Sequence, residues 1–115
     1  MRRMILAACL AAFSVTAAYA ADVMASRYGN TTIATDAKGV QTKLYYQSDS
    51  SLTAKQGDKN FTGTWKVTGD RLCLTFKDMA PTGMTNPNCV AVMAHTIGDT
   101  WKSGDRSVTL VKGIQ

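Results

Sequence analysis

The sequence predicts an all-β domain of seven or eight antiparallel strands, a meander that closes into a small barrel or folds into a sandwich. Two observations predict this fold class. Apolar and polar residues alternate along short segments, which is the period-two pattern of half-buried strands. Clusters rich in Gly, Asp, Ser and Asn separate these segments, and such short connections join neighbouring strands as hairpins. The choice between barrel and sandwich stays open.

Four segments alternate clearly and four others weakly. Between them, Gly57-Asp58, Gly69-Asp70 and Gly104-Asp105 supply residues that tolerate positive φ or bond to their own backbone, as turns require. Residues 24–28 are expected to form a turn, and no segment has a convincing helical period. The expected strands cover residues 31–35, 40–47, 51–55, 61–68, 71–77, 89–95, 100–102 and 106–111.

Large aromatic residues occupy inward positions of these strands. Phe61, Trp65, Phe76 and Trp101 all fall on the apolar face by parity. We expect them to fill the interior of so small a barrel, which leaves little room for a small apolar ligand.

The first twenty residues have the parts of a secretory signal peptide. Arg2 and Arg3 give a positive start, residues 4–15 are apolar, and Ala18-Tyr19-Ala20 fits the small-x-small cleavage rule. The apolar run is shorter than the roughly 20 residues that span a bilayer. Cleavage after Ala20 leaves residues 21–115 as one β-rich domain, expected to be soluble, without a transmembrane anchor, and periplasmic or secreted.

Two other interpretations of the leader remain open. The pair Arg2-Arg3 also occurs in twin-arginine signals, although no Ser precedes it here. The run Leu6-Ala7-Ala8-Cys9 has the form of a lipoprotein cleavage box, in which case Cys9 carries a lipid. Cleavage after Ala20 is favoured because only a handful of apolar residues precede that box.

The charge of the chain argues against a nucleic-acid partner. Without Arg2 and Arg3, thirteen basic residues become eleven against eight acids, and the net charge falls from +5 to +3. The basic residues are scattered, whereas a nucleic-acid site needs a basic stripe with interleaved aromatic residues.

The cysteines predict one disulfide. Removal of the leader takes Cys9 away and leaves Cys73 and Cys89, an even number in an oxidising compartment. Both fall on the polar face of their strands, so a bridge between neighbouring strands lies on the outer face. It would stand at the root of the one long loop, residues 78–88.

This loop is the candidate partner-binding surface. It contains Pro81, Gly83 and Pro87, which prevent a regular strand or helix. Met79 and Met84 are expected to be exposed beside the disulfide, an arrangement suited to insertion into a cleft of a protein or envelope partner. The alternative is an ordinary connection that its two prolines make rigid.

A soft-metal site is the alternative function. Thioether and imidazole groups suit Cu(I), and Met93 and His95 are expected on one face of the strand at residues 89–95. Small periplasmic copper carriers use Met/His sites on β-barrels. The competing interpretation is that Met93 packs under a loop while Met79 and Met84 fill gaps near the disulfide, as methionines usually do. No other cofactor is indicated.

Catalysis is not expected. His95 is the single histidine, the chain has no Glu, and its two remaining cysteines are expected to be oxidised. No nucleophile elbow, phosphate-binding loop, dinucleotide fingerprint or zinc spacing occurs. The expected function is therefore binding of a protein or envelope partner, as an inhibitor or adaptor, with the partner and the oligomeric state undetermined.

The C-terminal half resembles small exported bacterial proteins of uncharacterised function. The resemblance rests on Gly63-Thr64-Trp65, on Leu72-Cys73-Leu74 in the following strand, and on the second cysteine, Cys89. It implies a secreted β-domain with a disulfide, and it implies no activity, ligand or catalytic residue.

Overall fold

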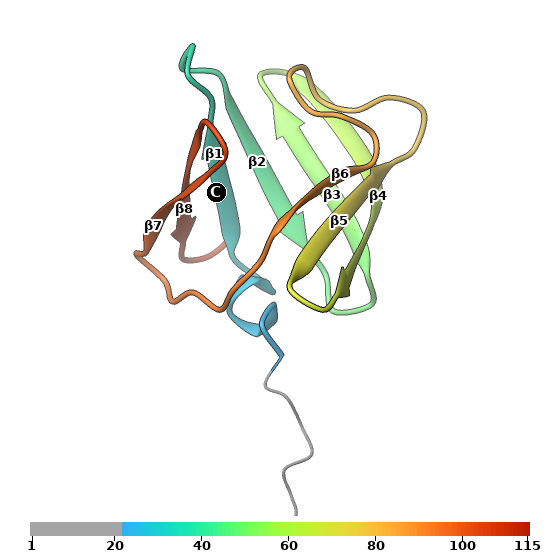
Figure 1. The fold of residues 1–115 in the computed structure, drawn as a ribbon. Helices are drawn as coiled ribbons and strands as arrows, with labels where there is room; N and C mark the ends of the chain where they lie inside the picture. Colours follow the sequence, from blue (N-terminus) through green and yellow to red (C-terminus); the bar gives the residue numbers. More distant parts are fainter. Residues whose placement is uncertain (1–21) are drawn as a thin grey trace, which may run out of the picture.

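The computed structural model describes residues 22–115. The expected signal peptide, with Cys9, lies outside the described residues. A 3-10 helix, η1, and eight strands follow one another along the chain (Figure 1). Their bounds are η1 Ala25–Arg27, β1 Thr31–Thr35, β2 Gln41–Tyr46, β3 Ser51–Gln56, β4 Lys59–Thr68, β5 Arg71–Phe76, β6 Asn88–Ala91, β7 Thr100–Ser103 and β8 Arg106–Val111.

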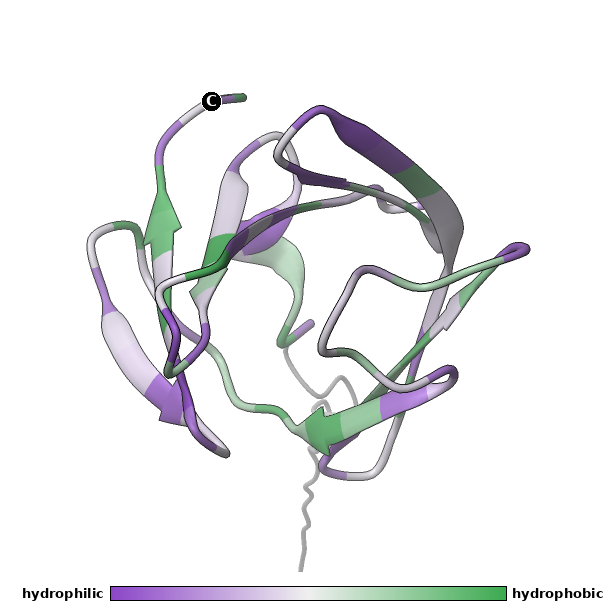
Figure 2. Ribbon diagram, turned by 90° about the horizontal axis from the view of Figure 1, so that it is seen from above, coloured by the Kyte–Doolittle hydropathy of each residue, from purple (hydrophilic) through white to green (hydrophobic). Residues whose placement is uncertain are grey.

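All eight strands belong to one antiparallel sheet in the order β6-β5-β4-β3-β2-β1-β8-β7. Strands β1 to β6 follow chain order, and β8 returns to pair with β1. The sheet curls round so that its two edges, β6 and β7, approach each other, and from above the strands form a ring (Figure 2). The all-β meander is confirmed, and the sheet forms a nearly closed barrel.

Three hairpins use the same turn. Gln56 pairs with Lys59, Thr68 with Arg71 and Ser103 with Arg106, so two residues, Gly-Asp, separate the strands each time. The glycine has positive φ in all three turns, 61°, 61° and 63°. A glycine with positive φ at the first position of a two-residue turn matches the right-handed twist of the flanking strands.

The core follows the predicted parity. Leu72, Leu74 and Phe76 point inward from β5, and Leu110 of β8 is fully buried. At the lower end of the barrel in Figure 1, η1 brings Met24 into the same core with no exposed surface. The described residues contain no helix of the length and apolar character needed to cross a membrane.

The sixth strand is shorter than predicted. It ends at Ala91, so the expectation that Met93 and His95 share a strand face is wrong. The Val92 N–H still donates to the Asp70 carbonyl at 2.8 Å. Residues 92–99 then run as an irregular segment down to the lower end of the barrel and across to β7 (Figure 1). Hydrogen bonds from Ser26 and Arg27 of η1 hold that segment.

Candidate functional site

A side pocket lies where the barrel fails to close. Strands β6 and β7 are the two edges of the described sheet, and a cavity of about 60 Å³ lies between them. Val90 of β6 and Trp101 of β7 form its opposite walls, and inward residues of β1, β2 and β8 line its interior. A single water needs roughly 10–15 Å³, so the pocket has room for a small organic molecule. The aromatic residues therefore fill less of the barrel than the sequence predicted.

The loop at residues 78–88 forms one border of this pocket. Met84 packs against the core and lines the cavity from that side. Arg106, at the start of β8, also lines the cavity and donates from its guanidinium to the Gly83 carbonyl. This contact joins the loop after β5 to the β7–β8 hairpin across the opening.

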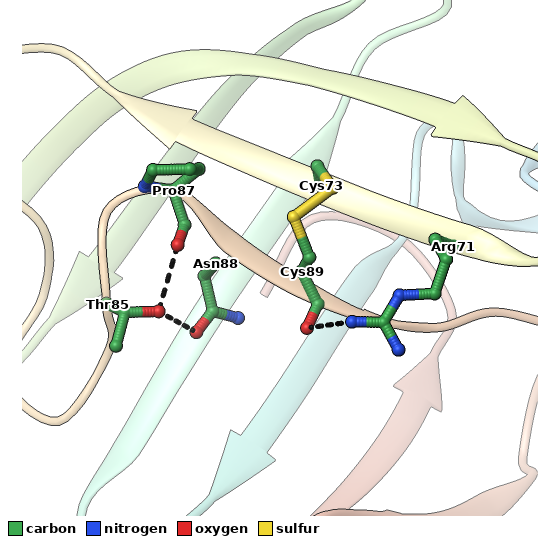
Figure 3. Close-up of a disulfide and its surroundings, with 6 residues drawn as sticks. All are labelled: Arg71, Cys73, Thr85, Pro87, Asn88 and Cys89. Carbon is green, nitrogen blue, oxygen red and sulfur yellow. Dashed lines mark hydrogen bonds between the residues drawn. A yellow bond between two sulfur atoms is a disulfide. The ribbon is translucent and has the colours of Figure 1, made fainter.

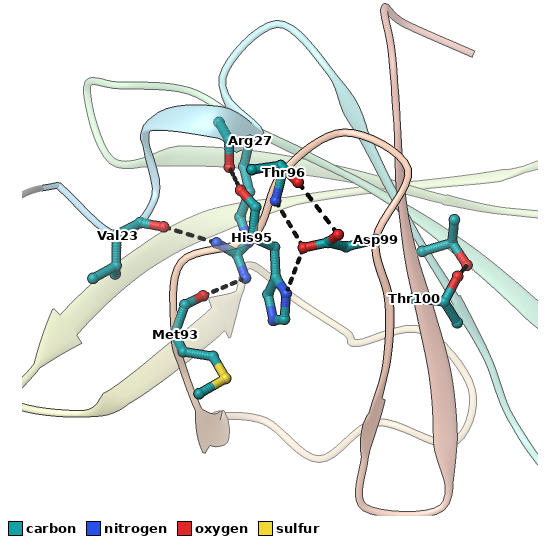
Figure 4. Close-up of polar contacts among 9 residues, drawn as sticks. Val23, Arg27, Met93, His95, Thr96, Asp99 and Thr100 are labelled. Carbon is teal, nitrogen blue, oxygen red and sulfur yellow. Dashed lines mark hydrogen bonds and ion pairs between the residues drawn. The ribbon is translucent and has the colours of Figure 1, made fainter.

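Arg27 borders the pocket at the other end. Its side chain is only 4% exposed although it carries a permanent charge. The guanidinium donates to the Val23 carbonyl at 2.9 Å and to the Met93 carbonyl at 3.3 Å (Figure 4). Burial lowers the pKa of Arg27 below its usual value, and the nearby Tyr46 acts in the opposite direction. The only ion pair among residues 22–115 joins His95 to Asp99, so Arg27 has no acidic partner there.

Two buried residues with hydroxyl groups accompany Arg27 in the lining, and the less buried Ser103 adds a third hydroxyl group. Tyr46 is 3% exposed, and burial raises its pKa to about 12, with the positive charge of Arg27 partly offsetting that rise. Thr32 is also 3% exposed, and its Oγ1 has no hydrogen-bond partner within the described chain. A buried hydroxyl without a partner costs about 1–3 kcal/mol, which marks Thr32 as an unusual feature of this interior.

A stack of three side chains supports Arg27. The rings of His95 and Trp101 lie 3.5 Å apart between centroids with their planes 7° apart, and the guanidinium carbon of Arg27 lies 5.5 Å from the Trp101 ring. Asp99 accepts from the Thr96 N–H at 2.9 Å and lies 3.3 Å from Nδ1 of His95 (Figure 4). The irregular segment is thereby folded against β7.

The disulfide holds the β6 border of the pocket. Cys73 and Cys89 are paired in the register of β5 and β6 and are bonded to each other. Cys89 is exposed, as parity predicted, so the bridge lies on the outer face. Arg71 donates to the Cys89 carbonyl at 3.3 Å on the same face (Figure 3).

The predicted partner-binding loop is well anchored and only partly exposed. Gln56 exchanges two hydrogen bonds with the backbone of Thr82, and the Asn86 side chain exchanges two with the backbone of Phe76. A cis peptide bond precedes Pro87, which is exposed. Met79 is 61% exposed, as predicted, whereas Met84 packs inward and Pro81 is fully buried.

The proposed copper ligands lie on the irregular segment. Met93 is 65% exposed. Nδ1 of His95 faces Asp99, so Nε2 is the ring nitrogen that a metal would have to use. Within residues 22–115, no three His, Cys, Asp or Glu side chains gather as a metal site. Copper binding by Met93 and His95 stays a prediction.

Sequence reasoning did not single out Arg27, Tyr46 or Thr32. The parity of β2 places Tyr46 inward with Leu44, and the parity of β1 places Thr32 inward with Ala34. Polar residues at inward positions were therefore the available signal for the two hydroxyl groups. Arg27 had no such signal, because it lies in a single turn outside any strand.

No family model, curated protein or solved structure matches this chain.

Proposed function

We propose that this chain is an exported binding protein whose side pocket holds a small molecule. The observation that carries the proposal is a cavity at the open seam of the barrel with buried polar groups in its wall. Small-molecule sites combine a largely apolar lining with a few convergent polar groups. Binding rather than catalysis is supported by the single histidine and the lack of Glu in the sequence.

Export is supported by the leader and by the disulfide. Residues 1–20 have the parts of a signal peptide, and disulfides persist in oxidising compartments. Cleavage after Ala20 predicts a mature chain that begins at Ala21, which the intact mass of the exported protein measures. Retention of residues 1–20 in the exported protein would contradict the proposed cleavage, and a mass that fits a lipidated Cys9 would favour the lipoprotein alternative.

A fragment screen by NMR tests the pocket. The mature protein is titrated with small anionic, neutral and cationic molecules, and its backbone and indole N–H signals are followed. We expect binding to shift the signals of Thr32, Tyr46 and Trp101, which line the cavity. Shifts that map elsewhere, or no shifts with any fragment, would contradict the proposal.

A matched variant fills the cavity. Ala34 lies in the wall of the pocket, and Ala34→Leu adds apolar volume to the cavity. Fragment binding is expected to disappear in this variant, while the rest of its NMR spectrum should remain that of a folded protein. Thr62→Leu is the control, because Thr62 is an exposed residue of β4 that is not part of the lining.

A second candidate function is binding of a protein or envelope partner through the loop at residues 78–88. Its supporting observation is Met79, an exposed apolar side chain on a loop whose backbone is fixed by Gln56 and Asn86. A rigid loop loses little conformational entropy when it binds. Met79→Ser should then abolish capture of one partner from envelope extract without lowering the Tm, and unchanged capture would contradict this candidate.

A further inference from the structure

Arg27 brings a positive charge to the pocket wall without a negative partner in the described chain. A buried charge that lacks a counterion is costly to the fold, and buried charges are normally paired. Two of the five N–H donors of its guanidinium are satisfied by the carbonyls of Val23 and Met93. The face of Trp101 offers a cation–π contact but no negative charge.

The other residues of the lining indicate which class of ligand could neutralise the charge of Arg27. The wall contains two arginines, Arg27 and Arg106, and no acidic residue. It therefore disfavours a cation. The two hydroxyl groups of Tyr46 and Thr32 can donate to an oxygen, and that of Thr32 is without a partner.

Apart from Asn88 and Ser103, the rest of the wall is apolar. Ala34, Leu44, Leu72, Val90 and Val108 contribute methyl and methylene groups. A ligand that complements both Arg27 and these apolar side chains has one anionic end and a short apolar end. The small cavity volume excludes a long acyl chain.

We propose that the ligand of the side pocket is a small monocarboxylic acid, with its carboxylate at Arg27 and the hydroxyl groups of Tyr46 and Thr32, and its alkyl group against the apolar wall. This inference rests on the proposed small-molecule function. A carboxylate fits better than a phosphate because it has a single charge, two oxygens and an apolar substituent. Arginine presents paired N–H donors to such a group.

The test compares butyrate with butyramide, which has nearly the same shape and no charge. Calorimetry and NMR on the mature protein measure both affinities, with butylammonium and inorganic phosphate as further probes. Butyrate is expected to bind more tightly than butyramide by about tenfold or more, because hydrogen bonds between charged groups are the stronger ones. Butylammonium and phosphate are expected to bind more weakly than butyrate.

Variants of the lining locate the carboxylate. Arg27→Gln should remove the preference for butyrate over butyramide, whereas Arg71→Gln, the same change of charge on the outer face, should keep it. Arg27 also holds the chain at Val23 and Met93, so Arg27→Gln can lower stability. Tyr46→Phe and Thr32→Val keep these contacts and should each weaken butyrate binding several-fold.

The outcomes separate the two proposals. Equal affinities for butyrate and butyramide at the pocket would overturn the carboxylate assignment and leave the small-molecule function standing. Tighter binding of phosphate or butylammonium than of butyrate would do the same. No binding of any probe or fragment at the pocket would overturn both.

Discussion

Cys73 and Cys89 are directly paired across β5 and β6, and their disulfide fixes the edge strand that forms one wall of the side pocket. Strand β6 has four residues and a neighbour on one side only. A strand this short is weakly held by its backbone hydrogen bonds alone. The covalent link on the outer face therefore keeps Val90, on the inner face, in place as a wall of the cavity.

Replacement of both cysteines should lower stability and loosen that wall. The bridge joins residues with a sequence separation of 16, and a loop of this length contributes about 3 kcal/mol in the chain-entropy model. We expect the double variant Cys73→Ser, Cys89→Ser to lose about that much in the free energy of unfolding, measured with urea. Hydrogen exchange should accelerate first at β6. Unchanged exchange at β6, or free thiols in the native exported protein, would contradict this role.

Gly63 should be intolerant of any side chain. It pairs with Phe76 in the β4–β5 register, and a Cβ at this position would lie 2.1 Å from the Thr75 carbonyl oxygen and 2.9 Å from the Cα of Phe76. Both are backbone atoms, so the two strands must separate. Gly63→Ala is expected to reduce stability by about 1–3 kcal/mol or more, measured by thermal and urea unfolding.

The neighbouring position provides the control for this prediction. Thr62 belongs to the same strand and is exposed, so Thr62→Ala should change stability by no more than about 0.5 kcal/mol. Equal stabilities of Gly63→Ala and Thr62→Ala would show that the close approach of β4 and β5 is not maintained in solution.

The sequence predicts the fold but not the pocket, because the fold follows from a local pattern and the pocket depends on contacts between residues far apart in the chain. Alternation is a local signal, and it placed Leu72 and Leu74 inward and Cys73 outward correctly. The early end of β6 depends instead on contacts between distant residues. The Met93 carbonyl accepts from Arg27, and the His95 carbonyl accepts from the Ser26 hydroxyl at 2.5 Å, across 66 and 69 positions of the chain.

The dependence on distant contacts also explains why the sequence does not predict a buried Arg27. A charged residue in a polar turn is expected at the surface, and nothing local indicates that η1 inserts it under the barrel. Trp101 was predicted to fill the interior, but its ring stacks on His95 in the pocket wall. The cavity remains because side chains at the seam pack on one another and do not fill the interior. They come from three separate segments: η1, residues 92–99 and β7.

Thr32 and Thr31 should respond in opposite directions to the same substitution. The Thr31 hydroxyl donates to the Gly113 carbonyl at 2.8 Å and accepts from the Gln115 N–H at 2.9 Å, whereas that of Thr32 has no partner within the described chain. Thr32→Val is expected to stabilise the unliganded protein by about 1 kcal/mol, because it removes a buried unpaired hydroxyl.

Thr31→Val is expected to destabilise the protein by a similar amount, because the Gln115 N–H and the Gly113 carbonyl lose their partner. Urea unfolding of both variants measures the two effects. A loss of stability in Thr32→Val would mean that its hydroxyl is satisfied in the free protein, and the case for a ligand at Thr32 would then lose its support.

The pH dependence of the pocket wall should depend on Asp99. The Thr96 N–H is the main cause that lowers the pKa of Asp99 below its usual range, and the side chains of His95 and Thr96 add to it. Because the folded pKa is lower than the unfolded one, this contribution to stability is present above the usual Asp pKa of about 4. It is lost as the pH falls from there through the lowered value.

Asp99→Asn should therefore be less stable than the wild type at neutral pH, and its free energy of unfolding should fall less on acidification. Asp105→Asn, the same change in the β7–β8 turn, is the control and should keep the pH dependence of the wild type. The local readout is the indole N–H signal of Trp101, which stacks on His95 and should shift on acidification in the wild type. The link between Asp99 and the pocket wall would be disproved by identical acid profiles for the wild type and Asp99→Asn. If the link holds, acidification weakens the segment that holds Arg27, and affinity for a ligand in the pocket falls with it.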